Sequence, residues 1–456
     1  MKHSHPFRAL WALMVGLFLI VVDSTVVAVA NPALKDEYDT DYGSVFWVTS
    51  GYLLAFAALL LVGGRLGDRF GPKYVYVIGL AIFSAASVWC GLSESIGMLT
   101  LARVVQGAGA ALLAPQIFTT ITRMFPLERR GVAMSVWGAT TGMGLFAGPI
   151  LGGVLLDQIG WRWIFFGSAP IGVIGLVLAV WLVPALPGRH LHMDPLGVLL
   201  SGAGIFLIVF GLQESERENW SPAIWFAIAA GLTLTAVFFG WQAVNPREPL
   251  IPLRLVMDRN FLLSNGGIAT VSFAFVAFVI PLMIFLQEAC GLSAVGAALL
   301  TAPMAVATVV LAPVVGKLVD RVHPRPIVIA GFAMLTVALL WLALEMSRTS
   351  AAAPMWRLLP PLAGVGVAGA FTWEPLAVIA SRALPPELAG AGSALCNTAR
   401  QLGAALSSAS VAALSQSMLL PVCAAALGGL IAMFIVTRER GTAAPVLLGD
   451  DMRVAL

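Results

Sequence analysis

The chain has 456 residues, of which 59% are hydrophobic and 11% are charged, and its formal net charge is +3. Soluble proteins carry about 25% charged residues, so this composition excludes an ordinary soluble domain and indicates that a lipid bilayer surrounds most of the chain. The small net charge does not predict a nucleic-acid-binding surface.

Fourteen apolar segments of near-spanning length follow one another along the chain. A membrane-spanning helix needs about 20 apolar residues, so each segment is predicted as one span of an all-α polytopic membrane protein. The predicted spans cover residues 8–31, 45–64, 73–92, 98–122, 132–156, 163–183, 195–213, 222–243, 260–286, 293–315, 326–345, 357–380, 390–414 and 418–437.

The loops between these spans carry unequal numbers of basic residues. If the N-terminus is cytoplasmic, nineteen Lys and Arg residues lie on the cytoplasmic side and five on the outer side, while Arg103 and Arg400 lie inside spans. Basic residues concentrate in the cytoplasmic loops of membrane proteins. We therefore expect both termini in the cytoplasm, which requires an even number of spans.

The first predicted span contains a carboxylate, Asp23, deep within an apolar segment. A charged side chain near the bilayer centre costs about 2.5–3.5 kcal/mol or more, so such acids are retained for a partner or a function. Asp23 is therefore a candidate for proton binding. A helix-packing role, in which neighbouring groups satisfy the carboxylate, stays open.

A short polar hairpin follows the second span and is repeated in the second half of the chain. Residues 64–73, GRLGDRFGPK, align without gaps with residues 316–325, GKLVDRVHPR. Two copies of one charged pattern, each between apolar spans, indicate a duplicated membrane protein. The first copy matches the loop signature G-x-L-x-D-R-x-G-x-K, and in this the chain resembles the major facilitator superfamily.

This resemblance implies a major facilitator fold with two pseudo-symmetric six-helix bundles. The hairpins lie 252 residues apart, from Gly64 to Gly316, which is more than six spans with short loops require, and spans seven and eight fill the excess. We expect an N-terminal bundle over residues 1–186, two additional central spans over residues 187–250 and a C-terminal bundle over residues 251–456. This 6+2+6 arrangement resembles the fourteen-span drug:proton antiporters.

In that family the hairpin serves conformational switching rather than binding. The resemblance implies that Asp68 pairs with a helix N-terminus or an arginine and holds the cytoplasmic gate shut. Gly71 is expected to supply a tight turn before Pro72. The switching residues expected on this basis are Gly64, Asp68, Arg69, Gly71, Lys73, Asp320 and Arg321.

Spans one and four carry further motifs of the antiporters. Residues 22–32, VDSTVVAVANP, resemble the signature L-D-x-T-v-v-n-v-A-L-P, and residues 101–111 resemble R-x-x-q-G at Arg103. At 1.5 Å per residue, Asp23 and Arg103 lie roughly 12 and 8 Å from the outer ends of their spans, so they can meet inside the N-terminal bundle. We expect Asp23 to be the proton-coupling carboxylate and Arg103 its regulator. An arginine that snorkels outward or binds backbone carbonyls is the alternative.

Span five contains GLFAGPILGG, which resembles the G-x-x-x-G-P-x-x-G-G motif of exporters in the superfamily. Glycines spaced by four line one helix face with bare backbone, and an internal proline removes a helix hydrogen bond and favours a kink. Close helix packing alone would explain the glycines but less readily the Gly-Pro pair. The motif residues are Gly144, Gly148, Pro149, Gly152 and Gly153.

Span twelve contains Trp373-Glu374-Pro375, where relatives usually have an apolar residue near Glu374. A carboxylate beside an indole can bind a cation or a proton. Trp373 and Glu374 are therefore predicted to contact the substrate and to favour cations. Glu374 can equally be a solvated or paired group near the cytoplasmic mouth, with Arg400 of the R-Q-x-G motif in span thirteen as its candidate partner.

Several motifs of other functions are absent from the sequence. It lacks the G-x-x-x-x-G-K-[ST] phosphate loop, H-E-x-x-H and G-x-S-x-G, so we expect neither an ATP-driven motor nor an enzyme. His190 and His192 have a metal-like spacing, but two loop histidines do not complete a site. We therefore expect no metal and no cofactor.

The resemblance implies a proton-coupled secondary active exporter of amphipathic organic compounds, of the kind that confers multidrug efflux and antibiotic resistance, in a bacterial cytoplasmic membrane. Its expected partners are a small-molecule substrate, protons and the lipid bilayer, and the expected state is a monomer. Two alternatives stay open. One is a dedicated exporter of a single endogenous metabolite or antibiotic, and the other is a transport-inactive sensor or scaffold, against which the membrane-embedded acids argue.

Overall fold

The computed structural model describes residues 6–40, 42–189, 194–215, 217–245, 249–251, 253–348, 355–385, 388–413 and 418–436. Within these ranges the regular structure is entirely helical, as the sequence predicts. The α-helices are α1 (Pro6–Glu37), α2 (Tyr42–Phe70), α3 (Pro72–Gly91), α4 (Ile96–Met124), α5 (Arg130–Ile159), α6 (Arg162–Phe166), α7 (Ser168–Leu182), α8 (Pro195–Glu214), α9 (Pro222–Val244), α10 (Leu253–Met257), α11 (Arg259–Ile284), α12 (Ala294–Leu300), α13 (Ala302–Arg321), α14 (Pro324–Arg348), α15 (Leu359–Ala383), α16 (Ala389–Ala413) and α17 (Leu419–Met433). Single turns of other helix types occur at η1 (Leu127–Arg129), η2 (Phe285–Ala289) and η3 (Met355–Leu358).

A helix is found in each of the fourteen predicted spans, but the count of fourteen membrane crossings is not confirmed. Among the described residues, twelve helices are long and apolar enough to cross a membrane. The helix α16 is long enough but carries Asn397, Arg400 and Gln401 along its length. The helix α17 is apolar, but its described helical part has only 15 residues. A helix that packs between other helices does not need an apolar surface all round, which explains how α16 tolerates its polar residues.

Large apolar side chains cover the outside of the helices as well as the core. Trp181, Phe226 and Val244 are each more than 70% exposed. In water such residues would form an aggregation-prone surface, whereas lipid tails solvate them. The exposed apolar surface therefore agrees with a membrane environment.

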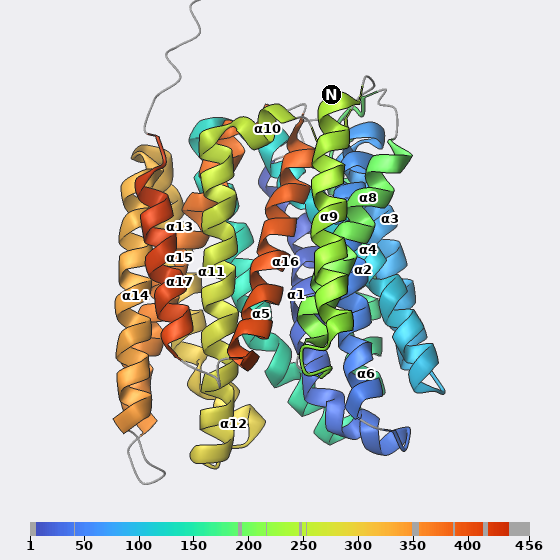
Figure 1. Cartoon of the computed structure of the whole chain (residues 1–456), viewed down its shortest axis with the longest axis vertical. Coiled ribbons are helices and arrows are strands. Elements are labelled where there is room, and N and C mark those ends of the chain that lie inside the picture. Colours follow the sequence, from blue (N-terminus) through green and yellow to red (C-terminus); the bar gives the residue numbers. More distant parts are fainter. Residues whose placement is uncertain are drawn as a thin grey trace, which may run out of the picture.

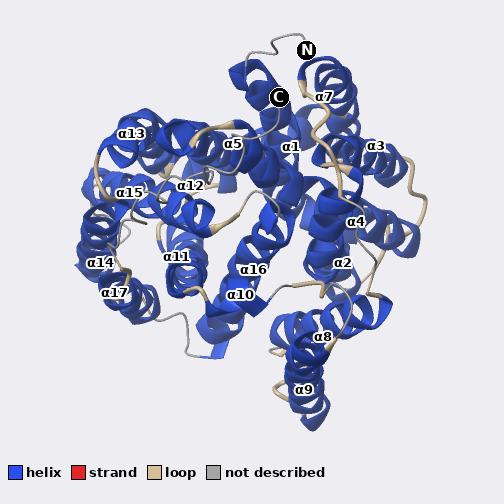
Figure 2. Cartoon of the chain, turned by 90° about the horizontal axis from the view of Figure 1, so that it is seen from above, coloured by secondary structure: helices blue, strands red, loops and turns tan. Residues whose placement is uncertain are grey.

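The helices gather into two groups that stand side by side (Figures 1 and 2). Helices α1–α7 pack mainly on one another, as do α11–α17, and the two groups touch chiefly where α2 and α4 meet α16 and where α5 meets α13 and α15. The predicted boundaries at residues 186 and 250 fall in the connections α7–α8 and α9–α10. That the three parts are separate units stays a prediction.

The central pair, α8 and α9, lies at the edge of the molecule beside α2 (Figure 2). Asp194 ties the pair together, because its carboxylate accepts hydrogen bonds from the Gly197 N–H of α8 and from Trp241 and Gln242 of α9. Burial raises the pKa of Asp194, but these hydrogen bonds and one from Asn245 outweigh burial and leave the pKa below its usual range. The stabilisation is therefore present at neutral pH and is lost as the pH falls through that lowered pKa.

Several helices begin at a proline that follows a residue suited to a turn. Gly71 precedes Pro72 with φ 94°, a left-handed conformation that favours glycine. A proline in the first turn lacks only an N–H that the helix does not use. Below, the N-terminal face is the end of the molecule at which α1 begins, α2 ends and α3 begins, and the opposite face is the other end (Figure 1).

Candidate functional site

Asp23 of α1 and Arg103 of α4 meet in the interior of the first group of helices. The Arg103 Nη1 donates to Asp23 Oδ2 at 2.6 Å, and the two side chains are 0% and 2% exposed. Gln106, one turn beyond Arg103, donates from Nε2 to Asp23 Oδ1 at 3.0 Å and accepts from Arg103 Nη1 at 2.6 Å. The carboxylate is thus held by a cation and an amide at once.

The surroundings of Arg103 fix its guanidinium in place. Its Nε donates to the Val48 backbone carbonyl at 3.1 Å, and its guanidinium carbon lies 4.2 Å from the centre of the Tyr52 ring. The Arg103 Nη2 and the Tyr52 hydroxyl are buried and have no hydrogen-bond partner among the described residues. Removing one member of such a buried ion pair leaves an uncompensated charge, which costs about 3–5 kcal/mol.

The arrangement is suited to proton binding controlled by geometry. A nearby arginine favours the carboxylate, whereas burial without the arginine favours the carboxylic acid. Asp23 meets both conditions that this rule names, because it is buried and paired with Arg103.

The glycines of α5 bring that helix close to α1, next to Asp23. A Cβ at Gly144 would lie 2.8 Å from a Val21 methyl group, and a Cβ at Gly148 would overlap the Thr25 hydroxyl. Pro149 lies inside α5, Gly152 is buried, and a Cβ at Gly153 would lie 2.8 Å from a Val295 methyl group. Gly144 and Gly148 of the predicted exporter motif therefore pack α5 onto α1, the helix that carries Asp23.

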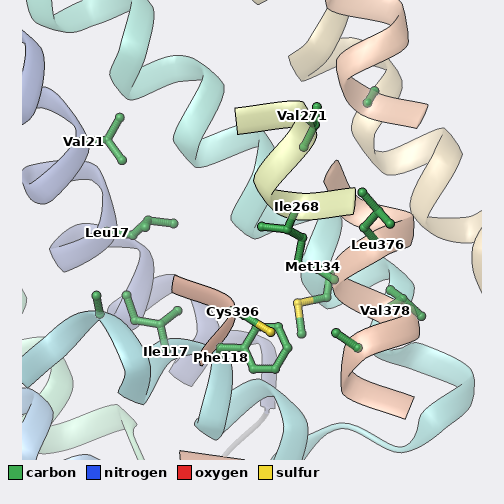
Figure 3. Close-up of a cluster of buried hydrophobic side chains, with 14 of the residues drawn as sticks. Leu17, Val21, Ile117, Phe118, Met134, Ile268, Val271, Leu376, Val378 and Cys396 are labelled. Carbon is green, nitrogen blue, oxygen red and sulfur yellow. The ribbon is translucent and has the colours of Figure 1, made fainter. Parts of the chain in front are cut away.

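A cavity lies between the two groups of helices and is lined mainly by apolar residues. Figure 3 shows Phe118, Met134, Ile268 and Cys396 gathered at this place from α4, α5, α11 and α16. The cavity is lined by Phe118, Trp137, Ile268, Trp373, Ala377, Cys396, Asn397 and Arg400. Arg400 is the charged member of this lining, and its guanidinium donates to Asn397 Oδ1 at 3.0 Å and lies 5.9 Å from the Trp137 ring centre.

The two residues predicted to bind substrate in span twelve face different ways. Trp373 lines the cavity, whereas Glu374 lies against α5, where a Cβ at Gly138 would overlap its Oε1. The proposed Glu374–Arg400 ion pair is wrong: no such pair is present among the described residues. Successive helical residues point about 100° apart, so Trp373 and Glu374 cannot share one face of α15.

The first hairpin binds the second group of helices at the N-terminal face. The Asp68 carboxylate accepts the backbone N–H groups of Gly390 and Ala391, both at 3.0 Å, at the beginning of α16. It also pairs with Arg123 of α4 at 2.9 Å. A carboxylate at a helix N-terminus satisfies free N–H groups and interacts favourably with the helix dipole.

The second hairpin makes the reciprocal contact. The Asp320 carboxylate accepts the N–H groups of Gly131 at 2.7 Å and Val132 at 3.1 Å, at the beginning of α5. Beside it, Arg130 donates to the Ser381 carbonyl of α15 at 2.7 Å. Each group of helices thus supplies an aspartate to cap a helix of the other.

The remaining hairpin residues surround these caps. A Cβ at Gly64 would lie 2.5 Å from the Gly390 carbonyl oxygen, so α2 and α16 touch backbone to backbone. Lys73 donates to the Val180 carbonyl of α7 at 2.7 Å, and the Arg69 guanidinium lies 5.0 Å from the centre of the Phe70 ring. Arg321 is exposed at the same face.

The comparisons with known proteins decide the family. A family model described as Major Facilitator Superfamily matches residues 13–408. The chain belongs to this superfamily. It is a membrane transporter and not an enzyme.

Relatives of this major facilitator protein include export proteins. An uncharacterized MFS-type transporter of Mycobacterium tuberculosis is 53% identical over 413 residues, which cover 91% of this chain and 71% of that protein. The tetracenomycin C resistance and export protein of Streptomyces glaucescens is 32% identical over 420 residues, which cover 91% of this chain and 77% of that protein. The multidrug resistance protein Stp of Mycobacterium tuberculosis is 30% identical over 396 residues, covering 86% and 72%.

Solved structures show the same fold. The proton:xylose symporter XylE has a TM-score of 0.69 at 16% identity, covering 95% of this chain and 96% of that one. The human organic anion transporter MFSD10 has a TM-score of 0.69 at 13% identity, covering 95% and 100%. At these identities the likeness concerns the major facilitator fold alone.

Sequence reasoning missed several residues of this transporter's site. Gln106 lies three residues after Arg103 on the same helix face, so its spacing allows it to reach Asp23 as well. Arg123 at the end of α4 and Gly138 in α5 gave no signal, because their partners are distant in the sequence. The motif on α2 could not show that Asp68 caps a helix that begins more than three hundred residues later.

Proposed function

We propose that this major facilitator protein is a proton-coupled secondary active exporter of amphipathic organic compounds in the cytoplasmic membrane. The observation that carries this proposal is the buried Asp23–Arg103 pair, with side chains 2% and 0% exposed. Two titration states of Asp23 linked to two arrangements of α1 and α4 are what proton coupling requires. The kinship with resistance and export proteins supports the outward direction.

In this proposal the protein has fourteen spans, and the N-terminal face with both termini is cytoplasmic. The two groups of helices rock about this central cavity, and α8 and α9 lie outside the moving interface. The reciprocal caps of Asp68 and Asp320 hold the cytoplasmic side closed. Protonation of Asp23 from the outer side loosens its pair with Arg103, and loss of that proton to the cytoplasm restores it.

The central cavity, with a volume of about 20 Å³ in this closed structure, is proposed as the centre of a substrate site that widens when the two groups of helices separate. Three of its residues, Phe118, Trp137 and Trp373, offer aromatic faces, and Arg400 offers donors. This lining favours flat apolar molecules that bear hydrogen-bond acceptors or an acidic group. Preference for cations through Glu374 would require the state in which the cytoplasmic side is open, because Glu374 does not line this cavity when that side is closed.

The transport test uses everted membrane vesicles and a panel of aromatic fluorophores in neutral, acidic and basic forms. Export should require a proton gradient and stop with an uncoupler. Asp23→Asn should abolish uphill export and may be compared with Asp36→Asn, an exposed acid on the same helix that should behave as wild type. Uphill, uncoupler-sensitive export by Asp23→Asn would show that coupling lies elsewhere. Export of one natural metabolite but none of the panel would favour the dedicated exporter.

The orientation test compares two exposed glutamates in a cysteine-free variant. Glu94 lies in the α3–α4 connection at the opposite face, and Glu128 lies in the α4–α5 connection at the N-terminal face. In intact cells, Glu94→Cys should react with a membrane-impermeant thiol reagent and Glu128→Cys should not. The reversed result would invert the proposed topology.

A further inference from the structure

Glu374 is a buried carboxyl group with no counter-charge among the residues that the structure describes. It is 1% exposed, and its Oε2 finds no hydrogen-bond partner in that part of the chain. No ion pair within the described ranges includes it. An isolated carboxylate in such surroundings costs several kcal/mol, so the group takes a proton instead of keeping its charge.

The carboxyl group lies at the seam between the two groups of helices. Glu374 belongs to α15 in the second group, and a Cβ at Gly138 of α5 in the first group would overlap its Oε1. The side chain therefore fills the space that a larger residue at position 138 would take. The seam must be closed for Glu374 to be buried.

Charged groups on the elements around α15 do not compensate Glu374. Arg130 on α5 and Arg382 on α15 each lie eight residues from this contact, about 12 Å along their helices, and donate to backbone carbonyls. No ion pair among the described residues links Glu374 to the remaining charged groups nearby. The described titratable and charged side chains on the neighbouring elements are Arg259 on α11, Lys317, Asp320 and Arg321 on α13, Arg325, Glu345 and Arg348 on α14, Arg357 on η3, and Cys396 and Arg400 on α16.

We propose that Glu374 is a second proton-binding site, occupied while α5 and α15 are in contact and emptied when they separate. Closing the N-terminal face then transfers one proton from water to the Glu374 carboxylate, and opening returns it. The inference rests on the proposed function only in taking this seam as one that opens during transport. It adds a proton site to the Asp23 pair and assigns Gly138 as the residue that makes room for it.

Acid supplies the proton that closure needs at Glu374. Asp68 and Asp320 also lie at the closed face, where they accept backbone N–H groups. The Glu374→Gln variant keeps both aspartates, so it isolates the contribution of Glu374 to the pH dependence. A glutamate in water ionises near pH 4.3, so above that pH the closed-to-open ratio should fall by up to about tenfold per pH unit.

The experiment measures this ratio in the purified full-length protein in lipid nanodiscs. Spin labels at Leu127 and Val322, exposed residues of the two groups at the N-terminal face, report the distance between them by pulsed electron paramagnetic resonance. The native cysteines are replaced, and the Asp23→Asn background removes that titration. From pH 5.5 to 8.5 the short-distance population should fall in the parent and stay high in Glu374→Gln. An unchanged pH dependence in Glu374→Gln would overturn the inference.

A second pair of variants tests the contact itself. Gly138→Ala should shift the population toward the long distance at every pH. Gly142→Ala, one turn away, is the control, because its Cβ would lie 3.5 Å from a Thr308 methyl group, an ordinary contact. Adding Glu374→Ala to Gly138→Ala should restore closure. Equal behaviour of the two alanine variants, or no rescue, would refute the proposed packing.

The outcomes separate this inference from the proposed function. The exporter is rejected and the proton site is kept if the wild-type protein fails to export while its distances depend on pH and only Glu374→Gln abolishes that dependence. If the wild-type protein exports with a proton gradient but the pH dependence of the distances is unchanged in Glu374→Gln, the exporter is kept and the proton site is rejected.

Discussion

The first hairpin, residues 64–73, and its copy, residues 316–325, join the two groups of helices at the same face in the same way. Each offers an aspartate to two backbone N–H groups at the beginning of a helix in the other group, α16 for Asp68 and α5 for Asp320. Each also has a glycine, Gly64 or Gly316, that lets two helices touch backbone to backbone. The reciprocal arrangement is what a duplicated protein with a two-fold relation between halves should show.

The copies differ in how strongly the aspartate is held. Asp68 is 1% exposed and paired with Arg123, whereas Asp320 is half-buried and the described residues provide it with no ion pair. The counterpart of Arg123 at the end of α15 is Arg382, which donates to the Val319 carbonyl instead. The same motif therefore holds the two groups of helices together more strongly through Asp68 than through Asp320.

The largest expected effect is at the aspartates themselves. Asp68→Asn keeps the shape but loses the charge that two backbone donors and Arg123 share, at a cost to the closed state of about 3–5 kcal/mol. Asp320→Asn should cost about 1–3 kcal/mol. Transport by Asp68→Asn should therefore be slowed much more, with substrate affinity little changed in both variants. Equal turnover of the two, measured with saturating substrate in vesicles, would contradict the asymmetry.

The two copies also differ in the residue before the proline, which is Gly71 in the first copy and His323 in the second. Gly71 has φ 94°, and a Cβ there would lie 2.6 Å from the Leu186 carbonyl oxygen. Gly71→His, which introduces the residue of the second copy, should cost about 2 kcal/mol or more through backbone strain and overlap. His323 accepts the Arg325 N–H, so His323→Gly should cost only about 0.5–1.5 kcal/mol. Thermal unfolding in detergent should show a clearly larger drop in Tm for Gly71→His.

For the glycines Gly64 and Gly316 we expect similar effects in the two copies. A Cβ at Gly64 would lie 2.5 Å from the Gly390 oxygen, and one at Gly316 would lie 2.7 Å from the Gly131 oxygen. Gly64→Ala and Gly316→Ala should therefore disfavour closure to a similar degree, by about 1–3 kcal/mol each. The spin-label distances at Leu127 and Val322 measure this. If alanine leaves closure unchanged at only one of the two positions, the two copies do not depend equally on close backbone contact.

The last comparison concerns the two arginines. Arg123→Gln removes an ion pair to a buried carboxylate and should weaken closure by about 1–3 kcal/mol. Arg382→Gln removes a hydrogen bond to a carbonyl and should cost about 1 kcal/mol. The discriminating measurement is a double-mutant cycle, which should show a larger coupling energy for Arg123 with Asp68 than for Arg382 with Asp320.

The helices, their apolar character and the duplicated hairpin could be read from the chain, because they depend on composition and on residues close together in the sequence. The meeting of Asp23 and Arg103 was also predictable, since two charged residues at similar depths in neighbouring apolar helices have few other partners. The number of crossings was less predictable. The helix α16 is polar along part of its length because it packs between the two groups, and a hydropathy pattern does not reveal that packing.

Only the tertiary structure decided which groups face one another across the two halves. Trp373 and Glu374 are neighbours in the sequence, yet the first lines the cavity and the second fills the space above Gly138, so the expected pair with Arg400 does not form. The partners of Asp68 are backbone N–H groups at the start of α16, and a backbone group leaves no mark in a sequence motif. Local residue types set what each side chain can bind, whereas the packing of distant helices sets what it does bind.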